Sequence, residues 1–303
     1  MSKKSEFDGG SNMRLFALEL NNDIKGIAQR KQYIESLISA LKAPDFVVLP
    51  ELALCSYMAC KDIWQYADDC GKDTSAWTVE MARKYRTFIG IGYLDKEKGD
   101  YYNRYLIAGP DGVCGTVSKS EGETAVFKNG QFDNIINTPF GNVGVAICYD
   151  AKRKHFYDNV KGEKLSMILF PHGCPADPRK PQVEHDTNDF FCGCYAEVFG
   201  VPVVYVNSKG KLEYMPGKMG AMMAKAGFTM NGMSRIYGDG CRQIETGLPE
   251  AVACEVPISS NRIKQEIRFY GQDLIKGNWF FRKFILEPDA KAGLQEYEKD
   301  IRL

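Results

Sequence analysis

A cysteine that directly follows a run of small and β-branched residues is the most informative feature of this chain. Residues 143–147 read Val-Gly-Val-Ala-Ile and predict a short buried strand that ends at Cys148. A thiol there would lie at the carboxyl edge of a sheet, where open α/β folds keep their ligand crevices. A helix that starts at this point would aim backbone N–H groups at the cysteine, and these would favour a thiolate and any oxyanion that it creates. The competing interpretation is a structural cysteine, because free cysteines are usually buried.

Two other side chains would complete a reactive set with Cys148. Glu51 follows the apolar run at residues 46–49, and Lys119 lies in a polar loop after a predicted hairpin. A thiol needs a base to become nucleophilic, and a buried glutamate can take its proton and return it to a leaving amine. A lysine and the backbone N–H of Tyr149 would stabilise the oxyanion of a tetrahedral intermediate.

The composition excludes several classes of protein. The 303 residues are 44% hydrophobic, and 39 basic residues balance 39 acidic ones, which argues against a nucleic-acid partner. No apolar stretch approaches the roughly 20 residues of a membrane helix. Residues 1–12 lack a signal-peptide pattern and the ten cysteines are scattered, so we expect reduced thiols and a cytoplasmic protein. Neither Cys55 with Cys60 nor Cys192 with Cys194 has a second pair at zinc-binding spacing, so no metal is expected.

The elements that must position these residues alternate between strand and helix. The opening β-α-β pattern predicts a parallel pair of strands joined by a crossover helix that Asn22 or Asp23 would cap. The patterns predict strands at 14–20, 46–49, 88–94, 102–108, 113–117, 143–147, 165–170 and 201–206, with further short strands within 228–256. They predict a first helix that ends at Pro44, a second at 78–85, a third that starts at about residue 152 and a fourth at 186–199. We therefore predict one α/β domain with a mixed sheet or paired sheets.

The two ends of the chain differ from its middle. Residues 1–12 are expected to be an extension outside the fold, residues 13–258 the domain, and residues 259–303 a C-terminal tail rich in aromatic side chains. The tail either packs on its own domain or covers a neighbouring subunit, because exposed aromatic patches usually mark interfaces.

An ordered set of short motifs resembles the nitrilase, or carbon–nitrogen hydrolase, superfamily. The matching stretches are Val48-Leu49-Pro50-Glu51-Leu52-Ala53-Leu54 with Tyr57, Tyr102-Asn103-Arg104, Gly109-Pro110-Asp111-Gly112, Thr138-Pro139-Phe140-Gly141, Val143 to Asp150, and Gly232-Met233-Ser234-Arg235-Ile236. Each stretch alone is weak evidence for the family, but the occurrence of all of them in the family's order along residues 13–258 is specific to it.

The resemblance implies a four-layer αββα sandwich, followed here by a C-terminal extension. It also implies a catalytic triad, with Glu51 as general base, Lys119 as the lysine and Cys148 as nucleophile, without a cofactor. Members usually associate as dimers or larger homo-oligomers. The Cys-Tyr-Asp motif at 148–150 resembles amidases and carbamoylases, whereas nitrile-cleaving members more often show Cys-Trp-Glu. The resemblance therefore implies a small amide or ureido substrate.

The chain departs from the family around its lysine. The family usually shows a Lys-x-His-Leu-like context, whereas Lys119 stands between two serines, and Lys128 is a competing candidate. We favour Lys119 because residues 127–130 resemble a later Phe-x-x-Gly segment of the family. Many members carry a second glutamate after the lysine that positions the substrate or the lysine. For this substrate-binding role we favour Glu123 over Glu121; the alternative is a solvated loop carboxylate.

Three other positions concern the substrate. Tyr57 is expected to contact the substrate, and His172, which follows a predicted strand, either faces the pocket or is a hydrogen-bonded loop histidine. The family's Pro-Glu after the nucleophile is missing, and Arg153 stands one place later than the usual arginine.

Three functions remain to be weighed. The first is a thiol-dependent hydrolase of a non-peptide C–N bond, and the second is a non-catalytic protein that binds a small molecule or partner in a degraded pocket. A redox role for Cys192 and Cys194 ranks last because their spacing and context do not fit it. An enzyme should have one unusually reactive thiol of low pKa, whereas a binding module should not.

Overall fold

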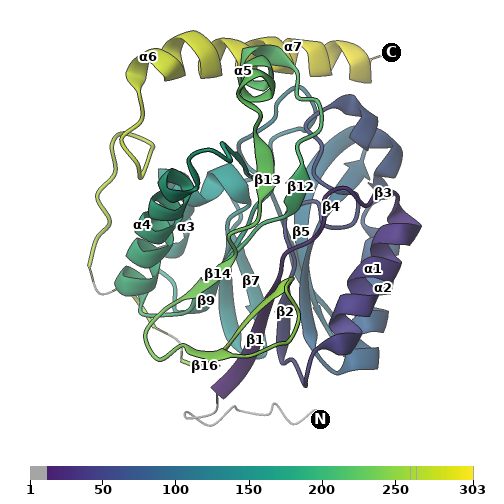
Figure 1. Ribbon diagram of the computed structural model, residues 1–303, viewed down its shortest axis with the longest axis vertical. Helices are drawn as coiled ribbons and strands as arrows, with labels where there is room; N and C mark the ends of the chain where they lie inside the picture. The colour runs from purple at the N-terminus through teal and green to yellow at the C-terminus, as the bar shows by residue number, and fades with distance from the viewer. Residues whose placement is uncertain (1–11, 260, 264, 303) are drawn as a thin grey trace.

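Two β-sheets packed face to face form the centre of the molecule, and helices cover both outer faces (Figure 1). The computed structural model describes residues 12–259, 261–263 and 265–302. The larger sheet has the strand order β15-β16-β1-β2-β4-β5-β6, with β3 beside β4. Its strands are β1 (Asn12–Leu18), β2 (Phe46–Val48), β3 (Asp68–Asp69), β4 (Phe88–Glu97), β5 (Asp100–Gly109), β6 (Gly112–Ser118), β15 (Arg242–Ile244) and β16 (Ala251–Pro257).

The second sheet has the order β14-β11-β9-β8-β7, and a small sheet of order β10-β13-β12 stands apart from it. These strands are β7 (Ile135–Thr138), β8 (Gly141–Val145), β9 (Leu165–Pro171), β10 (Pro175–Ala176), β11 (Val203–Val206), β12 (Lys209–Lys211), β13 (Thr229–Asn231) and β14 (Arg235–Tyr237). Strands β8, β9 and β11 run parallel, so the segments that follow β8 and β9 leave the sheet at the same edge.

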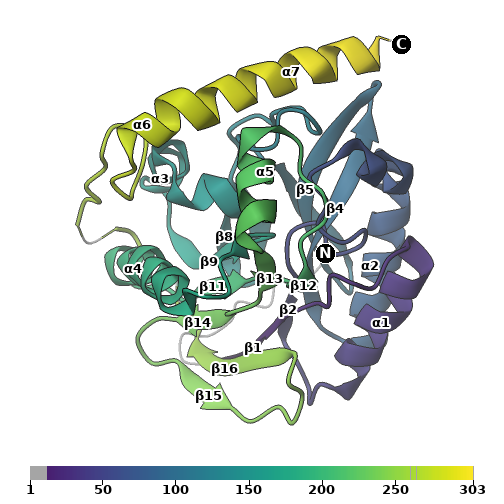
Figure 2. The same cartoon turned by 45° about the horizontal axis from the view of Figure 1, so that its top comes forward.

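The helices complete a four-layer αββα sandwich, as the sequence predicts. Helices α1 (Ile27–Ala40) and α2 (Lys72–Tyr85) cover the larger sheet. Helices α3 (Lys154–Val160) and α4 (Pro181–Phe199) cover the second sheet, β14-β11-β9-β8-β7 (Figures 1 and 2). Apolar side chains from the inner faces of both sheets interlock as the central core. The remaining helical segments are η1 (Lys61–Tyr66), η2 (Cys148–Lys152), α5 (Gly217–Ala226), α6 (Trp279–Phe281), η3 (Arg282–Leu286) and α7 (Glu287–Ile301).

The predicted β-α-β opening is confirmed, because β1 and β2 pair in parallel with Leu15 opposite Phe46. The predicted cap of α1 is wrong: Gly26 precedes the helix and no side chain caps it. The amide of Asn22 instead contacts the backbone of Tyr57, from whose N–H it accepts a hydrogen bond at 2.7 Å. The Asn22 side chain, which local propensity assigns to the helix cap, therefore bonds to a segment that is distant in sequence.

Three other boundaries differ from the expectation. Asn12, expected to lie outside the fold, is the first residue of β1 and pairs with Pro257; residues 1–11 lie outside the described residues. Helix α2 starts six residues earlier than predicted, and α4 starts five residues earlier, at Pro181, where a proline at the first helical position costs no hydrogen bond. Helix α5 was not predicted at all.

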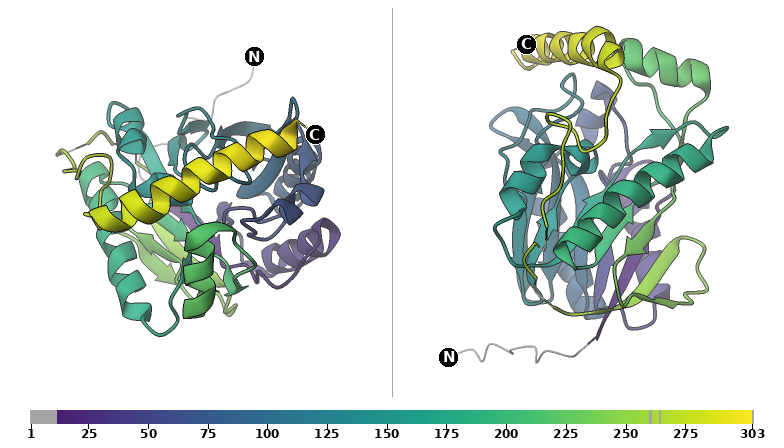
Figure 3. Two further views of the ribbon diagram at one scale, coloured as in Figure 1. Left: turned by 90° about the horizontal axis from the view of Figure 1, so that it is seen from above. Right: turned by 90° about the vertical axis from the view of Figure 1, so that its left-hand side faces the viewer.

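The C-terminal helices cross one end of the sandwich (Figure 3). Helix α7 packs on its own chain: Tyr297 is buried and accepts a hydrogen bond from the Tyr101 N–H at 2.9 Å, and Glu296 pairs with Lys61 at 2.6 Å. Before it, Trp279 and Phe280 stay 59% and 66% exposed. The tail therefore covers its own domain in part, and an oligomer interface at these aromatic residues stays a prediction.

None of the helices in the described ranges combines the length and apolar character that a membrane crossing would need.

Candidate active site

Glu51 lies fully buried just beyond β2 and is held by donors from three other segments. Its Oε1 accepts hydrogen bonds from Asn103 Nδ2 of β5 at 2.6 Å and from Lys119 Nζ at 2.8 Å. Its Oε2 accepts one from the backbone N–H of Gly173 at 2.6 Å. Glycine is required at 173, because a Cβ there would lie 2.2 Å from the Tyr57 ring. Both carboxylate oxygens thus have a fixed orientation.

Lys119 connects two carboxylates. Its ammonium lies 2.8 Å from Glu51 Oε1 and 2.8 Å from Glu123 Oε2, and Tyr57 donates a hydrogen bond to Glu123 Oε1 at 2.8 Å. Burial alone would lower the pKa of Lys119, but the charges of Glu123 and Glu51 raise it well above its usual value. The lysine is therefore a permanent cation at neutral pH.

The two glutamates differ in their pKa. Burial raises the pKa of Glu51, and the nearby charge of Lys119 opposes this only in part. Burial acts in the same direction on Glu123, but the charge and hydrogen bond of Lys119 outweigh it and lower the pKa of that carboxyl group. Glu51 is therefore the stronger base of the two.

Cys148 follows β8 and opens η2 in a left-handed backbone conformation, with φ of +51°. Residues without glycine's freedom adopt this conformation at an energetic cost, and such strain clusters at functional sites. The charges of Glu51 and Lys119 both act on its thiol, and the side chain lines a cavity. The N–H of Tyr149 lies in the first turn of η2, where backbone donors lack partners within the helix.

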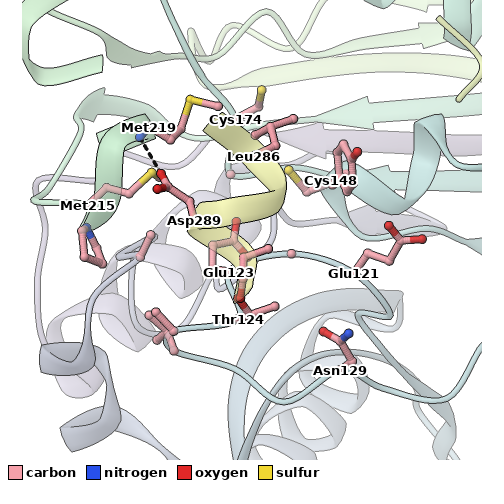
Figure 4. Close-up of a pocket in the computed structure, with 18 of the residues that line it drawn as sticks. Glu121, Glu123, Thr124, Asn129, Cys148, Cys174, Met215, Met219, Leu286 and Asp289 are labelled. Atoms are coloured by element: carbon pink, nitrogen blue, oxygen red, sulfur yellow. Dashed lines mark hydrogen bonds between the residues drawn. The ribbon is translucent and has the colours of Figure 1, made fainter. Parts of the chain in front are cut away.

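A second cysteine lies next to Cys148. Cys174 follows β9, the parallel neighbour of β8, and both thiols line the same cavity (Figure 4). Contact with Cys174 and burial raise the pKa of Cys148, whereas the same contact lowers the pKa of Cys174. Cys148 is therefore protonated at rest and needs a base, contrary to the expectation of a low pKa at this thiol.

Asp150 fixes the loop that carries Lys119. Its buried carboxylate accepts hydrogen bonds from the backbone N–H groups of Ser120 at 2.7 Å and Glu121 at 2.9 Å. Burial raises the pKa of Asp150 to about 6, although both N–H groups and the nearby His155 oppose the shift. The residue two places after Cys148 thus positions the lysine loop against the cysteine.

We expect Asp150→Asn to lower kcat about 10- to 100-fold, because an asparagine amide cannot accept from both N–H groups and the lysine loop would shift. KM should change less, since the cavity wall is intact. Steady-state kinetics of the amide hydrolysis that the family resemblance implies measure the effect, with Asp111→Asn in the exposed β5–β6 turn as the matched control. An unaltered kcat in a folded Asp150→Asn protein would contradict the positioning role.

The structure separates the alternatives that the sequence leaves open. Lys128 is half-exposed and pairs with Asp100, so it lies outside the site. Glu121 pairs with Arg153 at 2.9 Å and does not contact Lys119, whereas Glu123 does. The preferred residues Lys119 and Glu123 are the ones brought together with Glu51.

His172 lies behind the site and not in its cavity. Its ring is buried against Tyr205, with ring centroids 4.5 Å apart, and its Nδ1 lies 2.9 Å from the carbonyl oxygen of Phe170. Burial lowers the pKa of His172 to about 3. Among the described residues that line the cavity it is absent, so the expected substrate contact is wrong and the histidine is a structural one.

A cavity of about 750 Å³ opens at Cys148 beneath the C-terminal helices. Figure 4 shows Met215 and Met219 at the α5 side, Cys148 at the opposite side, and Leu286 and Cys174 between them. Tyr57 also lines it. The sequence patterns did not predict the positioning role of Asp150, the second thiol of Cys174 in the cavity, or the part of the cavity wall that η3 and α7 form. The spacing of these residues along the chain does not indicate that their segments meet.

A family model described as carbon–nitrogen hydrolase matches residues 21–161, which include the segments that carry Glu51, Lys119 and Cys148. A carbon–nitrogen hydrolase from Helicobacter pylori has a similar structure, with a TM-score of 0.67 at 18% identity over 82% of this chain and 89% of that one. The matched segment is just under half of the chain, and both comparisons support the resemblance to the carbon–nitrogen hydrolase superfamily that the motifs imply.

Curated relatives have a higher sequence identity, but over a shorter part of the chain. A probable nitrilase from Schizosaccharomyces pombe is 28% identical over 42% of this chain and 50% of its own length, and an omega-amidase from Bos taurus is 27% identical over 42% and 48%. The chain thus spans about half the length of the curated relatives it matches. An amidase mutant from Nesterenkonia sp., solved with the acetamide moiety of fluoroacetamide on its active-site cysteine, has a TM-score of 0.65 at 15% identity over 82% of this chain and 91% of that one.

Proposed function

We propose that the protein hydrolyses a non-peptide C–N bond in a small amide or N-carbamoyl compound, with Cys148 as nucleophile. The observation that carries the proposal is the buried contact of Glu51 with Lys119, whose charges act on a thiol that lines a closed-over cavity. A base of raised pKa can deprotonate the thiol as it attacks, and a permanent cation can stabilise the oxyanion, which are two requirements of acyl transfer.

In the first half of the reaction, Glu51 takes the Sγ proton of Cys148 as the sulfur attacks the carbonyl carbon. The ammonium of Lys119 and the N–H of Tyr149 stabilise the oxyanion of the tetrahedral intermediate. Glu51 then returns the proton to the departing nitrogen, so that ammonia or an amine leaves and a thioester remains on Cys148. Glu123 and Tyr57 hold Lys119 in place during these steps.

In the second half, Glu51 takes a proton from water as the water oxygen attacks the thioester carbon. Collapse of the second tetrahedral intermediate releases the acid, and the proton returns to the sulfur of Cys148. Water is the co-reactant of this half of the reaction. The cycle ends with the site in its resting protonation state.

The test combines labelling with hydrolysis. Fluoroacetamide should label Cys148 first among the ten cysteines, because Glu51 can take the thiol proton as the sulfur displaces fluoride, and peptide mass spectrometry would show the adduct. Ammonia release from short amides and N-carbamoyl amino acids should fall in step with that adduct.

Two results would overturn the proposal. Uniform slow labelling without hydrolysis of any compound would favour the non-catalytic binding module. Labelling confined to Cys174, the neighbouring thiol whose pKa is lowered, with the loss of hydrolysis in step, would move the nucleophile to that residue.

A further inference from the structure

We propose that the cavity accepts an uncharged amide with a flexible apolar acyl chain and discriminates against amides that carry a carboxylate. The inference rests on the proposed function, and it names the substrate class of the same site. Three features of the wall carry it: a flexible apolar surface, guanidinium groups already paired with carboxylates, and an excess of acidic side chains.

The apolar surface comes from two helical segments that close the cavity. Met215, Met219 and Met223 follow one another at helical spacing before and along α5, and Leu286 and Ala290 face them from η3 and α7. Asp289 ties the two segments together by accepting a hydrogen bond from the Met219 N–H at 2.8 Å. Methionine side chains are unbranched and adapt to irregular shapes, so this wall suits a flexible apolar chain.

The two guanidinium groups that line the cavity are not free to bind a substrate carboxylate. Arg153 and Arg282 both form ion pairs with Asp273, and Nε of Arg153 also pairs with Glu121 at 2.9 Å. Lys119 is likewise held between two glutamates. Each cation of the site, within the described residues, is therefore already matched by a carboxylate of the protein.

The acidic residues outnumber these cations along the wall. Among the described residues that line the cavity, four are carboxylates and two are guanidinium groups. The four are Glu121, Glu123, Glu287 and Asp289. A substrate carboxylate would lose its hydration and meet like charges without an unpaired cation, and both effects cost binding free energy.

The experiment compares three amides of equal chain length that differ only at the far end. These are hexanamide, the monoamide of adipic acid, which ends in a carboxylate, and 6-aminohexanamide, which ends in an ammonium. We expect kcat/KM for hexanamide to exceed that for the adipic monoamide at least ~10-fold, because like-charge contacts in a desolvated site disfavour binding of the carboxylate. The cationic amide should lose less than the anionic one.

A variant tests the cause of this preference. Asp273→Asn removes the carboxylate shared by Arg153 and Arg282, so it should raise the ratio of kcat/KM for the adipic monoamide to that for hexanamide at least ~10-fold. Asp158→Asn is the matched control, because Asp158 pairs with Lys154 and Lys161 outside the cavity. Glu121→Gln removes the other of the two carboxylates that pair with Arg153, so it should shift the same ratio in the same direction and serves as a second test should Asp273→Asn fail to fold.

The outcomes separate the inference from the function on which it rests. Preference for the adipic monoamide in the unmodified protein, or a ratio unchanged in both variants, would overturn the substrate class while hydrolysis itself stands. Absence of hydrolysis of all three amides, together with no acyl adduct on Cys148 by mass spectrometry, would overturn the proposed function first. Preference for hexanamide with the expected shift in Asp273→Asn supports both.

Discussion

Replacing Cys148 by alanine should lower amide hydrolysis by at least ~10³-fold, because the alanine methyl group cannot form the thioester through which both halves of the reaction pass. Substrate binding should persist, since the cavity is bounded mainly by other side chains. Ammonia release measures the first effect, and intact-protein mass spectrometry should show no acyl adduct. Calorimetry with hexanamide measures the binding that remains.

Two other cysteine variants make this result specific. Cys70→Ala removes an exposed thiol away from the cavity and should leave hydrolysis unchanged. Cys174→Ala removes the neighbouring thiol, and the acyl adduct should still form on Cys148. A Cys148→Ala protein that retains hydrolysis, or an adduct that disappears only in Cys174→Ala, would contradict the assignment of the nucleophile.

Replacing Glu51 by glutamine should lower kcat by about 10²- to 10⁴-fold, the range in which a positioned general base contributes. Glutamine has nearly the same shape, and Lys119 keeps Glu123 as its partner, so the fold should be retained. The thiol of Cys148, whose pKa is raised, would then lack a proton acceptor. Glu163→Gln, at an exposed position, is the matched control and should behave like the unmodified protein.

The pH dependence gives a second measurement of the same residue. The base must be ionised to act, and burial raises the pKa of Glu51 above its usual value of 4.5. Activity should therefore fall as the pH decreases through a value above 4.5, where an exposed glutamate would still be charged. The kcat/KM profile of the unmodified enzyme shows this limb. A limb at or below 4.5, or a Glu51→Gln enzyme of normal kcat, would speak against this role.

Much of the sandwich could be predicted because its strands and helices follow from patterns in short stretches of sequence. The buried strand before Cys148, the β1–β2 crossover and the β5–β6 hairpin each follow from apolar periodicity and turn residues within a short window. Helix α5 escaped prediction because it is only ten residues long and contains Gly217 and Gly220, which weaken its helix propensity. The start of α1 was misplaced because Asn22 bonds to Tyr57, which lies 35 residues away.

The sequence by itself determined the family resemblance and the three residue types of the site, because a strand that ends at Cys148 and a glutamate beyond another strand are local patterns. Only the tertiary structure decided which lysine and which glutamate complete the set, since Lys119 and Lys128 differ in burial and not in type. The same holds for the cavity. Its wall joins α5 to α7 across more than sixty residues, through contacts such as Asp289 with Met219. Spatial convergence of this kind depends on packing between distant segments, which no local window of sequence encodes.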